Sequence, residues 1–355
     1  MTHWFAFGLL ISLTVFSCTD DEGSQYAATP APLKTPLLFQ ELLSDPLIPV
    51  SNPQTVEGIA LGRKLFYDPI LSGDGTQACA NCHGQETTFT DPLRFSIGID
   101  GIAGRRNAMP LFNMAWNFTQ KFFWDGRSSS MEEQVFDPIE DPIEMHNTAE
   151  NAVASLQATN VYPDMFAAAF GTTTIDQTLV SKAIAQFERT LISANSKFDQ
   201  SLEGTATLTP SEANGLAVFM DESRGDCFHC HGNPNSPLWT DNSFHNNGLD
   251  EIFTDRGLGE FTGDPRDFGL FKSPSLRNLA YSAPYMHDGR FNTLDEVIDH
   301  YSEGLVFSPT IDPLMKTIAQ GGIQLIETDK EDLKAFLLSL SDPSFLSNPD
   351  FQNPN

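Results

Sequence analysis

The hydrophobic and polar positions of this chain follow the spacing of helices rather than of strands. Residues 58–66 and residues 176–203 both repeat apolar side chains at helical intervals. The inward faces consist of Leu61, Leu65 and Phe66 in the first segment and of Leu179, Ala183, Phe187 and Leu191 in the second. Proline cannot continue a helix, so the first should end at Asp68-Pro69. We predict one short helix and one long helix here.

Two later helices are predicted from their start signals. Thr209-Pro210-Ser211-Glu212 has the form of a capping box with proline at the first helical position, and its helix should run through Phe219. Thr328-Asp329-Lys330-Glu331 is a second candidate cap. The apolar stripe that follows it consists of Leu333, Phe336, Leu337 and Leu340. Because strand-like alternation does not stand out anywhere, the predicted fold class is mostly α.

The first 50 residues have a different character. Residues 4–17 form an apolar run that is too short to span a bilayer comfortably and that ends at Cys18. We predict a signal peptide over residues 1–17, with Cys18 acylated as in a lipoprotein; a plain signal peptide with an incidental Cys18 is the alternative. Residues 18–50 are predicted to be a mobile linker. Either alternative exports the chain, to the periplasm or to the outer membrane through a lipid anchor.

The charge balance limits the range of partners. The 355 residues include 20 Lys and Arg against 47 Asp and Glu, a formal net charge of −27. Such a surface repels nucleic acid and anionic membranes, and it suits solubility or a basic or neutral partner. We therefore expect no nucleic acid partner, and no membrane contact other than the lipid anchor.

Four of the five cysteines lie in two copies of one motif. Cys79-Ala80-Asn81-Cys82-His83 and Cys227-Phe228-His229-Cys230-His231 have the spacing of c-type haem attachment, in which both thiols bond the porphyrin and the histidine binds iron. A redox dithiol or half a zinc site would not explain the histidine after both pairs. The sequence predicts two haems c, with His83 and His231 as proximal ligands.

The two halves share more than their cysteines. Phe123-Trp124-Asp125-Gly126-Arg127 corresponds to Met286-His287-Asp288-Gly289-Arg290, so that Trp124 stands opposite His287. We predict two tandem cytochrome c-like haem domains, over residues 51–200 and 201–345.

The same alignment places Pro138 opposite Tyr301. Iron with a vacant sixth position can bind peroxide or oxygen, whereas iron with two side-chain ligands only exchanges electrons. Proline offers no ligating atom and tyrosine offers a phenolate, so the first haem should be open and the second closed. The alternative role of Tyr301 is to pack against the porphyrin.

Cleavage of an O–O bond requires a group that takes a proton from one oxygen and returns it to the other. Glu144, which follows Pro138 in an acidic stretch, is placed to do this, and Gln134 could hydrogen-bond the peroxide. Glu140, Asp141 and His146 are rivals of Glu144 that sequence reasoning does not separate from it.

These stretches resemble the bacterial diheme cytochrome c peroxidase family, including its MauG branch, across roughly residues 55–340. Besides both haem motifs, the resemblance rests on residues 71–75, 123–127, 142–145, 274–278 and 284–290. It implies peroxide binding at the N-terminal haem and electron transfer at the C-terminal haem. The implied reaction reduces hydrogen peroxide to water with electrons from a small donor protein, such as a cytochrome c or a cupredoxin.

The resemblance also implies residue roles. Glu144 matches the distal acid–base carboxylate, Gln134 its companion, and Trp124 the indole between the two haems. Asn107, with the carbonyls of Ser282 and Pro284, matches an interdomain calcium site, a set of hard oxygen ligands.

Two positions depart from typical peroxidases of the family and lean toward MauG. Ile99 stands where those peroxidases have a histidine that blocks the peroxide site, so the first haem should be open without reductive activation. Tyr301 stands where they have a methionine ligand and MauG-type proteins have tyrosine; Met286 is a lesser candidate ligand. The alternative functions are a MauG-like oxidase acting on a protein or organic substrate and, from another class, an electron-carrier cytochrome without turnover.

Overall fold

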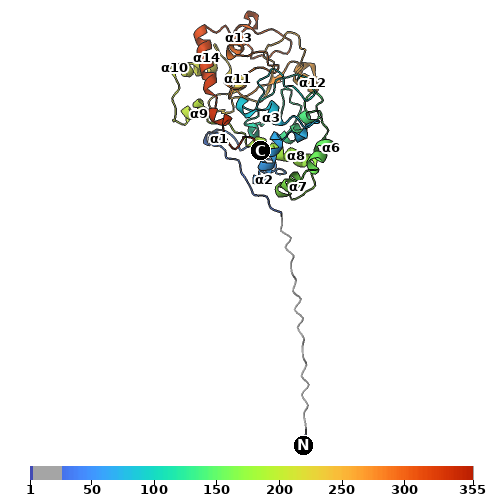
Figure 1. The fold of residues 1–355 in the computed structure, drawn as a ribbon. Coiled ribbons are helices and arrows are strands. Elements are labelled where there is room, and N and C mark those ends of the chain that lie inside the picture. The colour runs from blue at the N-terminus through green and yellow to red at the C-terminus, as the bar shows by residue number, and fades with distance from the viewer. Residues whose placement is uncertain (3–25, 355) are drawn as a thin grey trace.

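The computed structural model describes residues 1–2 and 26–354, and its ribbon is shown in Figure 1. Apart from residues 1 and 2, the predicted signal peptide lies outside the described residues, and so does Cys18. Within the described part, no helix combines the length and the apolar character that a membrane span requires.

The described chain is mostly helical, as the sequence predicts. The α-helices are α1 (Leu37–Leu42), α2 (Val56–Tyr67), α3 (Cys79–Cys82), α4 (Met131–Gln134), α5 (Phe136–Glu140), α6 (Ala149–Gln157), α7 (Tyr162–Phe170), α8 (Gln177–Arg189), α9 (Lys197–Leu202), α10 (Pro210–Met220), α11 (Phe228–His231), α12 (Leu258–Thr262), α13 (Leu294–Glu303), α14 (Glu327–Ser339) and α15 (Pro343–Leu346). The 3₁₀ helices are η1 (Pro69–Leu71), η2 (Gln85–Thr87), η3 (Met114–Trp116), η4 (Pro265–Asp267) and η5 (Ile318–Gln320). The strands β1 (Phe244–His245) and β2 (Phe271–Lys272) pair antiparallel.

A closely packed pair of helices supports each haem motif. In the first half α2 packs along α8, and in the second half α10 packs along α14. Figure 1 shows these pairs toward opposite ends of the molecule. A glycine permits each close approach: a Cβ at Gly62 would lie 1.8 Å from the Ala183 carbonyl oxygen, and one at Gly215 would lie 1.9 Å from that of Asp332. The backbones could not approach so closely with any larger residue.

The turns before helices α4 and α13 are also alike. Isolated bridges join Phe122 to Ser128 and, at the corresponding positions of the second half, Tyr285 to Phe291. Equivalent side chains then cap the helices, because Ser130 accepts from Glu133 N–H before α4 and Thr293 accepts from Glu296 N–H before α13. The repeat seen in the sequence is therefore present in the backbone.

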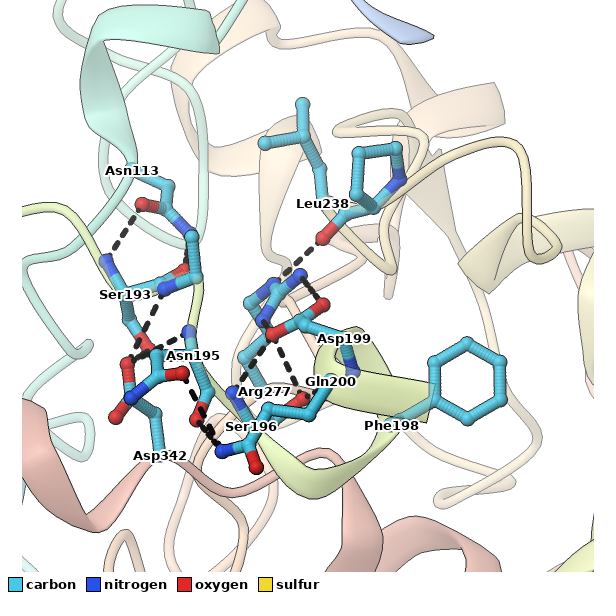
Figure 2. Close-up of polar contacts among 12 residues, drawn as sticks. Asn113, Ser193, Asn195, Ser196, Phe198, Asp199, Gln200, Leu238, Arg277 and Asp342 are labelled. Carbon is cyan, nitrogen blue, oxygen red and sulfur yellow. Dashed lines mark hydrogen bonds and ion pairs between the residues drawn. The ribbon is translucent and has the colours of Figure 1, made fainter. Parts of the chain in front are cut away.

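Two helix predictions need correction. The single helix predicted over residues 176–203 is wrong, since α8 ends at Arg189 and α9 begins at Lys197. Polar side chains hold the extended backbone between these helices: Asn113 Oδ1 accepts from Ser193 N–H, and Asp342 Oδ2 accepts from Ala194 and Asn195 N–H (Figure 2).

The predicted cap of the last helix is also wrong. Helix α14 begins at Glu327, after Ile326 as N-cap, so that Thr328 lies inside the helix. The stripe that follows is buried as predicted, with Leu333, Phe336, Leu337 and Leu340 all in the core of the second half. The cap of α10 by Thr209 and Glu212 is confirmed.

The first and last described segments of the fold pack on the first half. Residues 26–50 belong to the predicted linker and include α1, whose Leu38 and Phe39 are buried against Trp116. At the other end, Phe345 of α15 and Phe351 pack against Phe66 and Phe89. The predicted boundary at residue 200 falls within α9.

A buried ion pair joins α9 to the loop before the second turn (Figure 2). The Arg277 guanidinium donates to both carboxylate oxygens of Asp199, each at 2.7 Å, and its Nε donates to the Pro237 carbonyl oxygen at 2.5 Å. Burial raises the pKa of Asp199, but Arg277 outweighs this effect and holds the pKa below its ordinary value. Removing one partner would leave the other charged in the core.

We predict that Arg277→Met lowers the free energy of unfolding by about 3–5 kcal/mol, because Asp199 would remain buried without its partner. Denaturant unfolding of the haem-containing protein measures the change. Arg266, which pairs with Asp264 but is 89% exposed at its side chain, provides the control. Arg266→Met should cost less than about 1 kcal/mol; equal losses in the two variants would contradict the prediction.

Candidate active site

The first haem motif opens into a large cavity of about 1250 Å³. Pockets for small ligands typically measure about 300–1,000 Å³, so this cavity has room for a group as large as a porphyrin. Six of the predicted site residues line it together, namely Cys82, His83, Asn107, Trp124, Gln134 and Glu144. Residues of both halves contribute to its wall, since Lys272 and Pro274 line it as well.

The orientation of His83 suits iron ligation. Its Nδ1 lies 2.8 Å from the Phe89 carbonyl oxygen, to which it donates, and this leaves Nε2 free to bind a metal. Burial lowers the pKa of His83, so the imidazole is neutral at neutral pH, which is the form that binds iron. Left-handed backbone at Thr88 and Phe89 turns this carbonyl back toward the motif.

Glu144 is a carboxyl group in a largely desolvated part of the cavity. Burial raises the pKa of Glu144, and the nearby Asp141 carboxylate raises it further, while Arg127 and Arg105 oppose the shift. The segment that carries Glu144 is held in place by its backbone, because the Glu144 carbonyl oxygen accepts from Ile99 N–H at 2.9 Å. A carboxyl with a raised pKa accepts and returns a proton more evenly than an ordinary carboxyl.

Gln134 has an unused hydrogen-bonding group. Its Oε1 is buried and has no hydrogen-bond partner in the described part of the chain, although the residue lines the cavity. Buried polar atoms normally have partners. An unpaired acceptor that lines the same cavity as the Cys82 thiol and the oriented His83 imidazole fits a site for a bound group, and these residues match the haem that the motif predicts.

The rivals of Glu144 have other partners. Glu140 Oε1 accepts from Ala149 N–H, and Asp141 Oδ1 accepts from Ile143 N–H, although both residues line the cavity. His146 is exposed and contacts Asp100 through Nδ1 at 2.5 Å. The structure thus favours Glu144 as the carboxyl group that is free to act on a ligand.

Trp124 and His287, which correspond in the repeat, lie at the same junction between the halves. The Trp124 indole N–H donates to the Asn107 carbonyl oxygen at 2.8 Å, and Asn107 N–H donates to the His287 carbonyl oxygen at 2.8 Å. Trp124 is 8% exposed. The predicted electron path therefore lies at a hydrogen-bonded contact between the two halves.

The second haem motif has a different distal side. The Tyr301 hydroxyl is buried, which raises its pKa to about 12, and the Cys230 and Cys227 thiols contribute to the increase. This influence indicates that the hydroxyl lies near the second motif. Desolvation lowers the pKa of the partly buried His231 in that motif to about 4.

Asn247 connects both candidate ligands of the second iron. Its Nδ2 donates to the Tyr301 hydroxyl oxygen at 3.1 Å and lies 3.6 Å from Met286 Sδ. Its carbonyl oxygen contacts His300 Nε2 at 3.0 Å. Sequence reasoning missed Asn247, because nothing in the local sequence links residue 247 to residue 301.

Two further predictions stay predictions. Ile99 lies beside the Glu144 segment through the backbone contact described above, and its side chain has no atom that could bind iron. For calcium, the Asn107 side-chain amide donates to the Leu93 carbonyl oxygen at 3.1 Å.

Sequence reasoning also missed Arg106, which joins the halves at the cavity wall. Arg106 donates to Asp125 at 2.5 Å in the first half and to Asp255 at 2.7 Å in the second half. Glu260 lies 3.0 Å from the same guanidinium. These residues are far apart in sequence, and only the folded chain brings them together.

The chain is similar to known proteins of one family. Residues 56–207 match the family model described as di-haem cytochrome c peroxidase. The chain is 34% identical over 297 residues to the methylamine utilization protein MauG of Methylophilus methylotrophus, covering 82% of this chain and 84% of the relative. It is 34% identical over 266 residues to the cytochrome c551 peroxidase of Nitrosomonas europaea, covering 72% and 76%.

A solved structure is similar over most of its length. The crystal structure of a MauG-like protein associated with microbial copper homeostasis superposes with a TM-score of 0.80 at 36% identity, covering 88% of this chain and 97% of that one.

We predict that Tyr301→Phe changes the low-spin haem signal, because it removes the oxygen expected to bind the second iron. Electron paramagnetic resonance of the ferric protein measures this signal. The control is Tyr285→Phe, which removes another tyrosine hydroxyl of the second half, one that donates to the Leu279 carbonyl oxygen at 2.6 Å. An unchanged spectrum of Tyr301→Phe would exclude Tyr301 as a ligand.

Proposed function

The chain belongs to the di-haem cytochrome c peroxidase and MauG family of oxidoreductases, and from this premise we propose that it reduces hydrogen peroxide to water with electrons from an external donor. The observation that carries the proposal is that an oriented imidazole, His83, and a desolvated carboxyl, Glu144, line one cavity. The electrons would enter at the His231 site and pass to the His83 site.

The proposed cofactors are two haems c, and calcium is a candidate at Asn107. When bound, the haem iron of the first site supplies the Lewis acid and the electrons for O–O cleavage. His83 would hold this iron, and Cys79 and Cys82 would fix the porphyrin. His231, Cys227 and Cys230 would do the same in the second half.

The chain's own residues would then handle the protons. Glu144 would accept a proton from the peroxide oxygen nearer the metal and donate it to the leaving oxygen, so that water departs without separating charge. Gln134, whose Oε1 has no described partner, would accept a hydrogen bond from the peroxide and orient it. Pro138 also lines the cavity, and it carries no ligating atom that could occupy the oxidant's place.

Trp124 would shorten the gap that an electron crosses between the two halves. Its indole is buried, and its carbonyl oxygen accepts from Lys272 N–H at 2.9 Å, which ties it to β2 of the second half. A fixed aromatic ring in this position would provide one defined route.

A MauG-like oxidase is the second candidate, favoured by Tyr301 and Ile99. The buried Tyr301 hydroxyl lies beside the second haem motif, and an anionic oxygen ligand stabilises ferric iron relative to a thioether. In this alternative, the same oxidising power acts on a protein or organic substrate. An electron carrier without turnover is the third candidate. The Glu144 carboxyl and Gln134 Oε1, which line the cavity and would have no role in electron transfer alone, argue against it.

We also propose that the chain is exported and held at the membrane by a lipid on Cys18. The apolar run of residues 4–17 and the two haem c motifs support export. A small cytochrome c or cupredoxin in the same compartment would be the donor.

We predict that Glu144→Gln lowers the rate of peroxide turnover by about 10²–10⁴-fold, since the amide cannot exchange the proton. Stopped-flow mixing of peroxide with the oxidised enzyme measures the rate. Glu140→Gln alters a neighbouring cavity carboxylate and should leave the rate unchanged. The Glu144 role would be wrong if both variants reacted at the wild-type rate.

The pH profile gives an independent check on Glu144. The carboxyl must be deprotonated to accept the peroxide proton, and its pKa lies above the ordinary value of 4.5. Turnover should therefore fall as the pH drops through this raised pKa, and Glu144→Gln should lack that step.

A steady-state measurement separates the two leading candidates. We expect rapid peroxide reduction by fully oxidised enzyme when a reduced small cytochrome c is present, and little reduction without it. Slow turnover in both cases, together with a long-lived oxidised state of the protein, would instead support the MauG-like oxidase.

A further inference from the structure

A buried lysine of the second half lies in the wall of the first haem cavity. Lys272 in β2 is 8% exposed and lines the same cavity as His83. Its ammonium donates to the Lys121 carbonyl oxygen at 3.2 Å, and the ring centroid of Phe122 lies 5.8 Å from Nζ. One carbonyl and one ring leave most of the positive charge uncompensated.

The other cations of the cavity wall all have carboxylate partners. Arg106 pairs with Asp125 and Asp255, Arg127 with Asp125, and the exposed Arg105 lies 4.0 Å from Asp141. By contrast, no carboxylate oxygen of residues 26–354 lies within 4.0 Å of the Lys272 ammonium. Burial lowers the pKa of Lys272 to about 8, and no other group contributes to the shift.

A buried ammonium is costly unless an anion faces it. The protein's net charge of −27 shows that carboxylates are abundant, yet the fold directs none of them to this lysine. We infer that Lys272 binds a carboxylate inside the cavity, and that this carboxylate is a propionate of the haem attached through Cys79 and Cys82. The inference rests on the haem of the proposed function, not on its peroxidase activity.

Two sources could supply the carboxylate, a resident haem propionate or a free carboxylate molecule. The resident group is favoured because Lys272 is fixed on three sides: its N–H donates to the Trp124 carbonyl oxygen, its ammonium to the Lys121 carbonyl oxygen, and β2 pairs with β1. Such rigidity suits a permanent ligand. The ammonium would then compensate negative charge near the first iron and favour its ferrous form.

The test uses the protein with both haems attached, in buffer free of carboxylates. Lys272→Met should lower the midpoint potential of the His83 haem, so that the ferric-to-ferrous ratio at the wild-type midpoint rises at least tenfold, or 59 mV. Lys272→Arg, which keeps the charge, should stay near wild type. Lys34→Met removes a charge at an exposed position and should leave the potential unchanged.

A second readout identifies the propionate directly. Redox-difference infrared spectra of protein whose haem propionates carry ¹³C should show a labelled carboxylate band that shifts in Lys272→Met and stays in place in Lys34→Met. If the Lys272→Met protein does not attach the first haem, Lys272→Gln is used instead. This variant loses the charge but retains a side-chain donor toward the Lys121 carbonyl oxygen. It should show the same changes in potential and in the infrared band.

Three results would overturn the inference. The first is an unchanged potential and an unchanged labelled band in both neutral variants, and the second is a shift of potential confined to the His231 haem. The third is a potential that depends on Lys272 only when acetate is added, which would indicate a site for free carboxylates. Peroxide turnover enters none of these readouts. If the wild-type protein did not turn over peroxide but the Lys272 variants still showed the shift in potential, the proposed function would be rejected and the propionate contact would still hold.

Discussion

A histidine can serve as a fixed iron ligand only if its second ring nitrogen is held by another group, and the contact between His83 Nδ1 and the Phe89 carbonyl oxygen meets this condition. The contact turns Nε2 of the first motif away from the protein backbone. It requires left-handed backbone at Thr88 and Phe89, where the chain doubles back immediately after the motif. The arrangement of Glu144, Gln134 and Trp124 around the cavity has chemical meaning only with respect to an imidazole fixed in this way.

The second constraint is that two equivalent backbones carry different side chains. The turns at 122–128 and 285–291 form the same bridge, and serine and threonine cap the helices that follow in the same way. After these caps the halves diverge: Pro138 lies in the short α5, whereas Tyr301 lies in the continuous α13. A duplicated frame thus carries a residue without a ligating atom in one half and a hydroxyl in the other. The chain is 34% identical both to a MauG protein and to a cytochrome c551 peroxidase.

The sequence was informative wherever a feature depends on neighbouring residues. The Thr209 box, the stripe of α14 and both haem motifs are local patterns, and the structure contains each of them. Predictions from the sequence failed where contacts between residues that are distant in the chain determine the structure. The segment predicted as one helix over residues 176–203 is interrupted because Asn113 and Asp342, which are remote in the chain, bind the backbone between α8 and α9. Likewise, Phe39 of α1 packs against Trp116, which is far from it in the sequence. Asn247, Arg106 and Lys272 belong to the candidate sites for the same reason: only tertiary contacts bring them there, and no local motif marks them.

The position of the last residues has a consequence for assembly. Phe345 and Phe351 pack on Phe89, and the Gln85 side chain donates to the carbonyl oxygens of Phe345 and Asn348. A ribosome makes residues 79–89 well before residues 345–351. The ring beside the carbonyl that orients His83 therefore gains these two aromatic neighbours only after both haem motifs have been synthesised. Packing around the first motif thus depends on a segment that follows the second motif in the chain.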